Sequence, residues 1–106
     1  MDLLAGSCFF IDLERHSNGA EMWLEANLTS RILTSVITYS ALAAGIESRS
    51  KLEELLAGIP ILPINLGCAW IAGKTARILL RQGRTIGANE LWIAAIALQA
   101  ELPVFN

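Results

Sequence analysis

The chain has 106 residues, of which 54% are hydrophobic and 17% are charged, and its formal net charge at pH 7 is −2. This length predicts a single domain. Because about 25% of residues are charged in an average protein, the low charged fraction predicts that a second copy or another chain covers part of the apolar surface. The slightly acidic balance excludes nucleic-acid binding through overall charge, so any attraction to phosphate must come from a local patch.

Cysteine usage and the longest uncharged stretch exclude two other classes. Cys8 and Cys68 lie far apart without a CxxC pair, and they are expected to be small buried hydrophobic residues in a reducing cytosol rather than metal ligands. Residues 55–73 carry no charge, but two prolines interrupt them, which favours a strand, a turn and a buried helix over a membrane span. The chain is therefore expected to be soluble and cytoplasmic, with no membrane partner.

Two strands are expected in the first third of the chain. The apolar run Phe9-Phe10-Ile11 predicts a buried strand, and residues 32–35 predict a second one. Between them, residues 19–27 have the apolar spacing of a helix. The inward face of that helix is expected to consist of Met22, Trp23 and Ala26.

Helices are expected to dominate the rest of the chain. They are predicted over residues 36–46, 51–57, 66–82 and 90–100. Ser35 and Asn89 are suitable N-caps for the first and last of these, and Gly58 and Gly83 are glycines of the type that ends a helix. Short strands are predicted over residues 59–64 and 102–105, the former at a sheet edge because of its prolines.

Strands that alternate with helices predict parallel strand pairing and an α/β fold. Because the expected strands are short and apolar, the sheet should be covered by helices on both faces. The sequence therefore predicts a three-layer sandwich with a short, mainly parallel sheet of about four strands flanked by helices.

Four segments, taken in order, resemble the VapC branch of the PIN family. They are residues 9–15 (FFIDLER), 34–47 (TSVITYSALAAGIE), 62–63 (LP) and 83–95 (GRTIGANELWIAA). The resemblance implies one PIN-like domain over residues 1–106 that lacks the family's C-terminal strand. It further implies a toxin of a toxin–antitoxin system that cleaves RNA with Mg²⁺ or Mn²⁺, forms a homodimer and is restrained by a VapB-like antitoxin.

The resemblance also implies which residues occupy the family's metal-binding positions. The first acid falls on Gly6, with Ser7 at the neighbouring hydroxyl position, and the second falls on Ala41. The third falls on Glu90, one methylene longer than the family's Asp, and the fourth lies beyond the last residue. Glu90 and Ser7 are therefore the candidate catalytic residues, and Glu90 is the candidate metal ligand. Glu90 could equally be an acid that stabilises the start of its helix.

Four cations, Lys74, Arg77, Arg81 and Arg84, recur at spacings of three, four and three residues. On a helix this spacing places the first three along one face. They could bind an RNA backbone or an acidic partner segment, or they could simply form a solvated face. The three tryptophans, Trp23, Trp70 and Trp92, are expected in the core or in an interface rather than stacked on bases.

Two functional hypotheses remain open at this point. The first is a VapC-like, Mg²⁺-dependent ribonuclease whose activity is impaired, since most of its metal-binding acids are replaced or absent. The second is an inactive PIN scaffold that works as a dimerisation or antitoxin-binding module. The loss of acids could reflect natural decay or a deliberate change, and the sequence does not separate the two.

Overall fold

The computed structural model describes residues 1–15, 19, 22–24 and 30–105. In these residues the strands form a single parallel sheet in the order β3-β2-β1-β4. The strands are β1 (Asp2–Ala5), β2 (Arg31–Ser35), β3 (Ile61–Leu62) and β4 (Val104–Phe105). Because the strands are parallel, their carboxyl ends meet at one edge of the sheet, which is where the candidate site lies.

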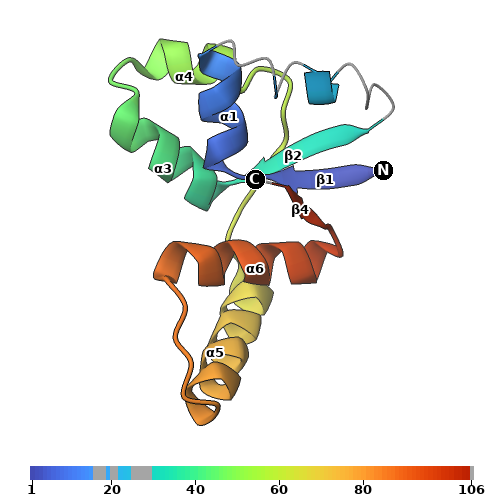
Figure 1. Ribbon diagram of the computed structural model, residues 1–106, viewed down its shortest axis with the longest axis vertical. Helices are drawn as coiled ribbons and strands as arrows, with labels where there is room; N and C mark the ends of the chain where they lie inside the picture. The colour runs from blue at the N-terminus through green and yellow to red at the C-terminus, as the bar shows by residue number, and fades with distance from the viewer. Residues whose placement is uncertain (16–18, 20–21, 25–29, 106) are drawn as a thin grey trace.

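Helices cover the sheet on both faces, which confirms the predicted three-layer sandwich (Figure 1). They are α1 (Ser7–Glu14), α3 (Val36–Gly45), α4 (Arg49–Leu55), α5 (Leu66–Arg81) and α6 (Ala88–Ala100). One core joins α1, α3 and α4 around Phe9, Phe10 and Leu42. A second core joins the other face of the sheet to α5 and α6 around Leu4 and Ile96. No helix in the described part of the chain is long and apolar enough to cross a membrane.

The prediction of a strand at Phe9-Phe10-Ile11 is wrong, because these residues lie in α1. The first strand is instead Asp2–Ala5, whose last three residues are buried. Neighbouring residues of a strand point to opposite faces, whereas Phe9 and Phe10 are both buried within one hydrophobic core. A run of three apolar residues is too short to distinguish the two structures by its periodicity.

Helix ends follow the predicted capping in one of two cases. Ser35 is the N-cap of α3, and its side chain accepts a hydrogen bond from the backbone N–H of Thr38 at 3.1 Å. Asn89 is not a cap, because α6 begins at Ala88 with Gly87 as the N-cap residue. Both predicted C-terminal strands shrink to two residues, since prolines lack the N–H that a longer strand pairing would use.

The helix predicted over residues 19–27 lies only partly within the described residues. Met22 is 67% exposed, so its predicted inward position is wrong. Trp23 is half-buried and stacks on Phe105 with ring centroids 4.6 Å apart, while Ala26 lies outside the described residues. Cys8 is exposed rather than buried.

Candidate functional site

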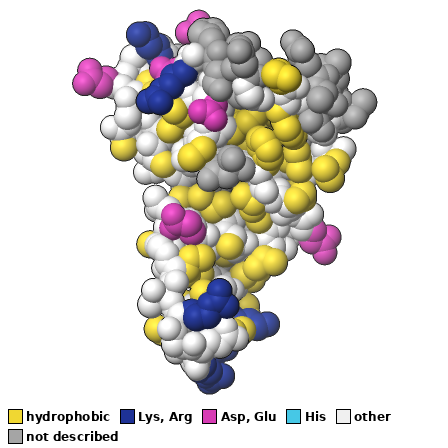
Figure 2. Space-filling view, in the orientation of Figure 1, with side chains coloured by type: hydrophobic (Ala, Val, Ile, Leu, Met, Phe, Trp, Pro, Cys, Tyr) yellow, Lys and Arg dark blue, Asp and Glu magenta, His cyan; other side chains and the backbone are white. Residues whose placement is uncertain are grey.

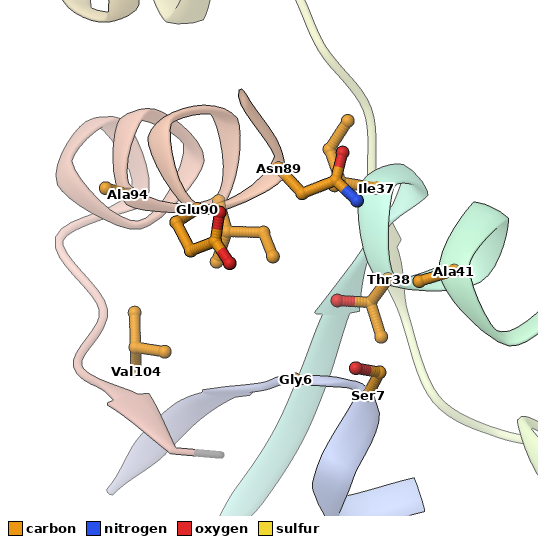
Figure 3. A pocket seen from close by; sticks show the side chains of 10 residues that line it. Gly6, Ser7, Ile37, Thr38, Ala41, Asn89, Glu90, Ala94 and Val104 are labelled. Carbon is orange, nitrogen blue, oxygen red and sulfur yellow. The ribbon is translucent and has the colours of Figure 1, made fainter. Parts of the chain in front are cut away.

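A cavity of about 310 Å³ lies where the carboxyl ends of β1 and β2 meet the first turns of α1, α3 and α6 (Figure 3). It is lined by Gly6, Ser7, Ile37, Thr38, Ala41, Asn89, Glu90, Ile93, Ala94 and Val104. In an α/β fold with parallel strands, this end of the sheet is the usual place for a ligand. All three acid positions that the family resemblance implied within this chain line the same cavity, together with Ser7.

Gly6 and Ser7 enter the cavity because β1 ends one residue earlier. The backbone N–H of Gly6 donates to the carbonyl of Phe105 at 2.9 Å, which ties this point to β4. On the other side, the buried hydroxyl of Thr34 donates to the carbonyl of Ala5 at 2.8 Å and ties β1 to β2. Gly6 is itself the N-cap residue of α1, with no side chain to cap the helix.

Ala41 reaches the cavity from α3, one turn after Thr38. The Thr38 side chain is almost fully buried, and its hydroxyl accepts a hydrogen bond from the Ser35 hydroxyl at 3.3 Å. This part of the cavity wall therefore consists of the Thr38 side chain, whose hydroxyl is hydrogen-bonded to Ser35, and the methyl group of Ala41. The sequence interpretation missed Thr38 as a cavity residue, although its place three residues before Ala41 on a helix was a usable signal.

Glu90 supplies the carboxylate of the cavity and points into it from the first turn of α6 (Figure 3). Its carboxylate lies directly over Gly87, where a methyl group on Gly87 would overlap Oε2 of Glu90. A carboxylate at a helix start is stabilised by the helix dipole. Asn89 beside it also lines the cavity, whereas the sequence predicts it only as a helix cap.

The cavity has few groups with which to hold a divalent metal ion. Magnesium and manganese favour several oxygen ligands, usually with carboxylates among them. Glu90 contributes one carboxylate, whereas Gly6 and Ala41 contribute no side-chain oxygen. Across the described residues, no group of three or more His, Cys, Asp or Glu side chains could hold a metal ion. This set of donors does not fit the family's metal.

The four predicted basic residues lie on α5 and in the loop after it, and none of them lines the cavity. Lys74, Arg77 and Arg81 are exposed on α5, as is Arg84 after the turn at Gly83, whose φ is +69°. The structure therefore separates the basic residues from the candidate metal ligand Glu90.

The PIN domain family model matches residues 7–105, and the chain belongs to the PIN domain family. Among curated proteins, it is 29% identical to Ribonuclease VapC5 of Mycobacterium tuberculosis over 91 aligned positions, which cover 77% of this chain and 67% of the relative. It is 34% identical to Ribonuclease VapC1 of Haemophilus influenzae strain R2866 over 85 aligned positions, which cover 72% of this chain and 63% of the relative. The matches thus span about two thirds of the length of these ribonucleases.

Solved structures with the same fold are toxin–antitoxin complexes. VapBC-1 from nontypeable Haemophilus influenzae matches with a TM-score of 0.81 and 28% identity, over 100% of this chain and 86% of that chain. VapBC2 from Rickettsia felis, bound to a DNA fragment from the promoter, matches with a TM-score of 0.84 and 24% identity, over 98% of this chain and 85% of that chain. The resemblance to the VapC branch that the sequence motifs indicated is confirmed.

Proposed function

We propose that this chain is a VapC-type PIN domain that binds an antitoxin-like protein and whose own RNA cleavage is impaired or lost. The observation that carries the proposal is the composition of the cavity, in which Gly6 and Ala41 occupy two acid positions and, among the described residues that line it, Glu90 alone supplies a carboxylate. A metal ion held by one carboxylate and water would be weakly bound and poorly positioned, whereas metal-dependent hydrolysis needs an ion at a fixed position.

The antitoxin-like partner is supported by VapBC-1 from nontypeable Haemophilus influenzae, a solved structure with this fold that is 28% identical to this chain. It is also supported by the apolar surface, because large hydrophobic side chains stay exposed on α5 and α6. The most exposed of these are Leu66, Trp70, Leu80 and Leu98. A second copy of the chain would cover part of such a surface, and we include a homodimer in the proposal. Light scattering of the purified chain tests the dimer.

The competing function is residual RNA cleavage with Glu90 as metal ligand and Ser7 as a neighbouring hydroxyl. It is favoured by the position of both side chains in one cavity. An RNA cleavage assay with Mg²⁺ or Mn²⁺ separates the two functions. The impaired domain is expected to leave RNA intact, whereas a residual nuclease would cleave it and would lose that activity on Glu90→Gln.

Restoration of the acids provides the stronger test. The double variant Gly6→Asp/Ala41→Glu places two carboxylates in the cavity, and the backbone conformation at both positions suits the new residues. Gly6 has φ −93° and ψ −178°, which any residue adopts, and Asp is favoured at an N-cap. Ala41 is exposed, so its helix position can extend a longer side chain towards the cavity.

We expect metal-dependent RNA cleavage to appear in this double variant. The matched control is Ala44→Glu/Asn65→Asp, which adds two carboxylates outside the cavity, on α3 and at the N-cap of α5. It should remain inactive. RNA cleavage by the unaltered chain at the same rate as by the restored variant would contradict the proposal.

A further inference from the structure

The cations of the chain are unevenly distributed. Residues 55–89 contain four cations and no carboxylate, whereas the other 71 residues contain four cations and all ten carboxylates. Within a chain of net charge −2, this segment therefore carries a net charge of +4. The ion pairs between described residues join Arg31 to Asp2 and Arg49 to Glu53. They use none of the four cations of this segment, all of which are exposed, so its positive charge is open to a ligand.

These cations lie where the second half of α5 extends away from the sheet. Figure 1 shows α5 projecting beyond α6 to the far end of the long axis, and Figure 2 shows Lys and Arg side chains there without Asp or Glu beside them. Lys74, Arg77 and Arg81 follow one another on one face of α5 at spacings of three and four residues. We call residues 74–86 the basic tip.

The turn that ends α5 fixes the position of Arg84. The backbone N–H of Arg84 donates to the carbonyl of Leu79 at 2.9 Å, and the N–H of Gly83 donates to the carbonyl of Leu80 at 3.0 Å. Gly83 has a φ of +69°, the left-handed conformation in which glycine ends many helices. Because of this hydrogen-bonded turn, Arg84 lies beside the last turn of α5 rather than in a free loop.

A small apolar hollow lies at the basic tip, between α5, the loop after it and α6. It has a volume of about 150 Å³ and is lined by Ala76, Leu79, Leu80, Arg84, Thr85, Ile86 and Leu91. Leu80 is 68% exposed and Ile86 is 42% exposed, so two aliphatic side chains of its wall are open to solvent. A space of this size can hold a benzene-sized apolar group. Because Arg84 lines the same hollow, a group bound there would lie beside a positive charge.

The basic tip does not suit a second copy of the chain. In a two-fold dimer the same surface of both chains meets, so a contact centred on the tip would place cations against cations with no carboxylate between them. Like charges that meet across an interface weaken it. A nucleic acid would match the charge, but its phosphates offer nothing to the hollow or to Leu80 and Ile86. A protein segment that combines carboxylates with an apolar side chain matches both features.

We infer that the basic tip binds an acidic segment of the antitoxin-like partner, with an apolar side chain of that segment in the hollow and carboxylates against Arg77, Arg81 and Arg84. Guanidinium groups bind carboxylates through two parallel hydrogen bonds, which favours Asp and Glu as their partners. The inference rests on the proposed function, since it assigns a surface to the partner proposed there, but it requires neither the cavity nor a metal ion. Trp70 lies one turn before the tip; at 67% exposure it is not a core residue, and it remains part of the apolar surface described above.

Selection from a phage-displayed library of random dodecapeptides tests the inference. The library is first depleted on Arg81→Glu/Arg84→Glu and then selected on the unaltered chain, so that the peptides retained require the basic tip. Both steps are done in EDTA at low ionic strength, where exposed charges are least screened. We expect the retained peptides to have a negative net charge and at least one large apolar side chain. Retention of neutral or basic peptides, or no enrichment on the unaltered chain, would overturn the inference.

Fluorescence anisotropy of the most enriched peptide, labelled with fluorescein, measures what each part of the tip contributes. Arg81→Ala/Arg84→Ala should weaken binding roughly twofold to thirtyfold, as expected for two exposed ion pairs, and should make binding less sensitive to salt. Leu80→Ser removes an exposed apolar part of the hollow, so it should weaken binding without changing the salt dependence. The matched control Arg49→Ala/Lys51→Ala removes the same charge from α4 and should leave binding unchanged, with circular dichroism confirming that all variants are folded. Equal weakening by the two double variants would overturn the inference.

Two other occupants of the basic tip give different results. A dimer in light scattering that dissociates on Arg81→Glu/Arg84→Glu would assign the tip to a second copy of the chain. A single-stranded RNA dodecamer that displaces the labelled peptide at a lower concentration than the unlabelled peptide does would assign it to a nucleic acid. Either result overturns the inference. Failure here is distinguishable from failure of the proposed function, because peptide binding is measured without metal and the restored variant is read by metal-dependent cleavage.

Discussion

The hydrogen bond from the Thr34 hydroxyl to the carbonyl of Ala5 holds the carboxyl ends of β1 and β2 together, one residue before the cavity begins. Thr34 is completely buried. The change Thr34→Val keeps the shape of the side chain and removes the donor. A buried carbonyl that loses its partner costs about 1–3 kcal/mol, and the additional methyl group returns up to about 0.8 kcal/mol. We therefore expect the free energy of unfolding to fall by about 1–2 kcal/mol.

Urea unfolding followed by far-UV circular dichroism measures this change. The midpoint should fall while the m value stays constant, because the same surface is exposed on unfolding. The melting temperature should fall by roughly 4–16 °C, since a domain of this size loses about 4–8 °C per kcal/mol. Thr85→Val, at an exposed loop position, is the control and should change stability by less than about 0.5 kcal/mol. An equally small effect of Thr34→Val would refute the idea that this bond holds the two strands.

Two further predictions concern the framework of the cavity. Phe10 of α1 is completely buried in the core, so Phe10→Ala should lower the free energy of unfolding by about 3–5 kcal/mol, as measured by urea unfolding. The control Leu98→Ala, on the exposed surface of α6, should lower it far less. Similar losses for the two variants would contradict the assignment of Phe10 to the core. Ser35→Ala removes the N-cap of α3 and its bond to the Thr38 N–H, and should cost about 1 kcal/mol by thermal melting. Ser35→Thr should recover most of that loss, and its failure to do so would show that more than capping is involved.

The sequence alone predicts which residues occupy the family's acid positions. Gly6, Ala41 and Glu90 were assigned by their place in motifs, and all three line one cavity. These assignments are independent of the wrong strand prediction for residues 9–11, which lie in α1. A motif identifies which residue occupies a position of the family without identifying its secondary structure. Whether these residues bind metal stays a prediction.

Other features depend on contacts between segments that are distant in the sequence. The Thr34–Ala5 bond joins residues 29 positions apart, and the contact between Trp23 and Phe105 joins opposite ends of the chain. Asn89 was expected to cap a helix on the basis of residue type alone, yet α6 begins one residue earlier with Gly87 as its cap residue. Residue preferences describe single positions, whereas packing selects among the several that could begin a helix.

The exposure of α5 could not be derived from its sequence either. The spacing of Lys74, Arg77 and Arg81 predicted a common face, and all three are exposed on α5. It did not show that Trp70 would share that face at 67% exposure, because a tryptophan on an apolar helix is more often buried. The neighbours of each helix face decide this, and they are known only once the helices are packed.

The most direct test of the central claim is the melting temperature of the unaltered chain as Mg²⁺ or Mn²⁺ is raised to about 10 mM. An ion that binds the folded state stabilises it by about 2.7 kcal/mol at a hundred times its dissociation constant. Because the cavity offers Glu90 as its carboxylate, we expect no saturable rise for this chain and a clear rise for Gly6→Asp/Ala41→Glu. A saturable rise in the unaltered chain that disappears on Glu90→Gln would contradict the claim that this PIN domain has lost its metal site.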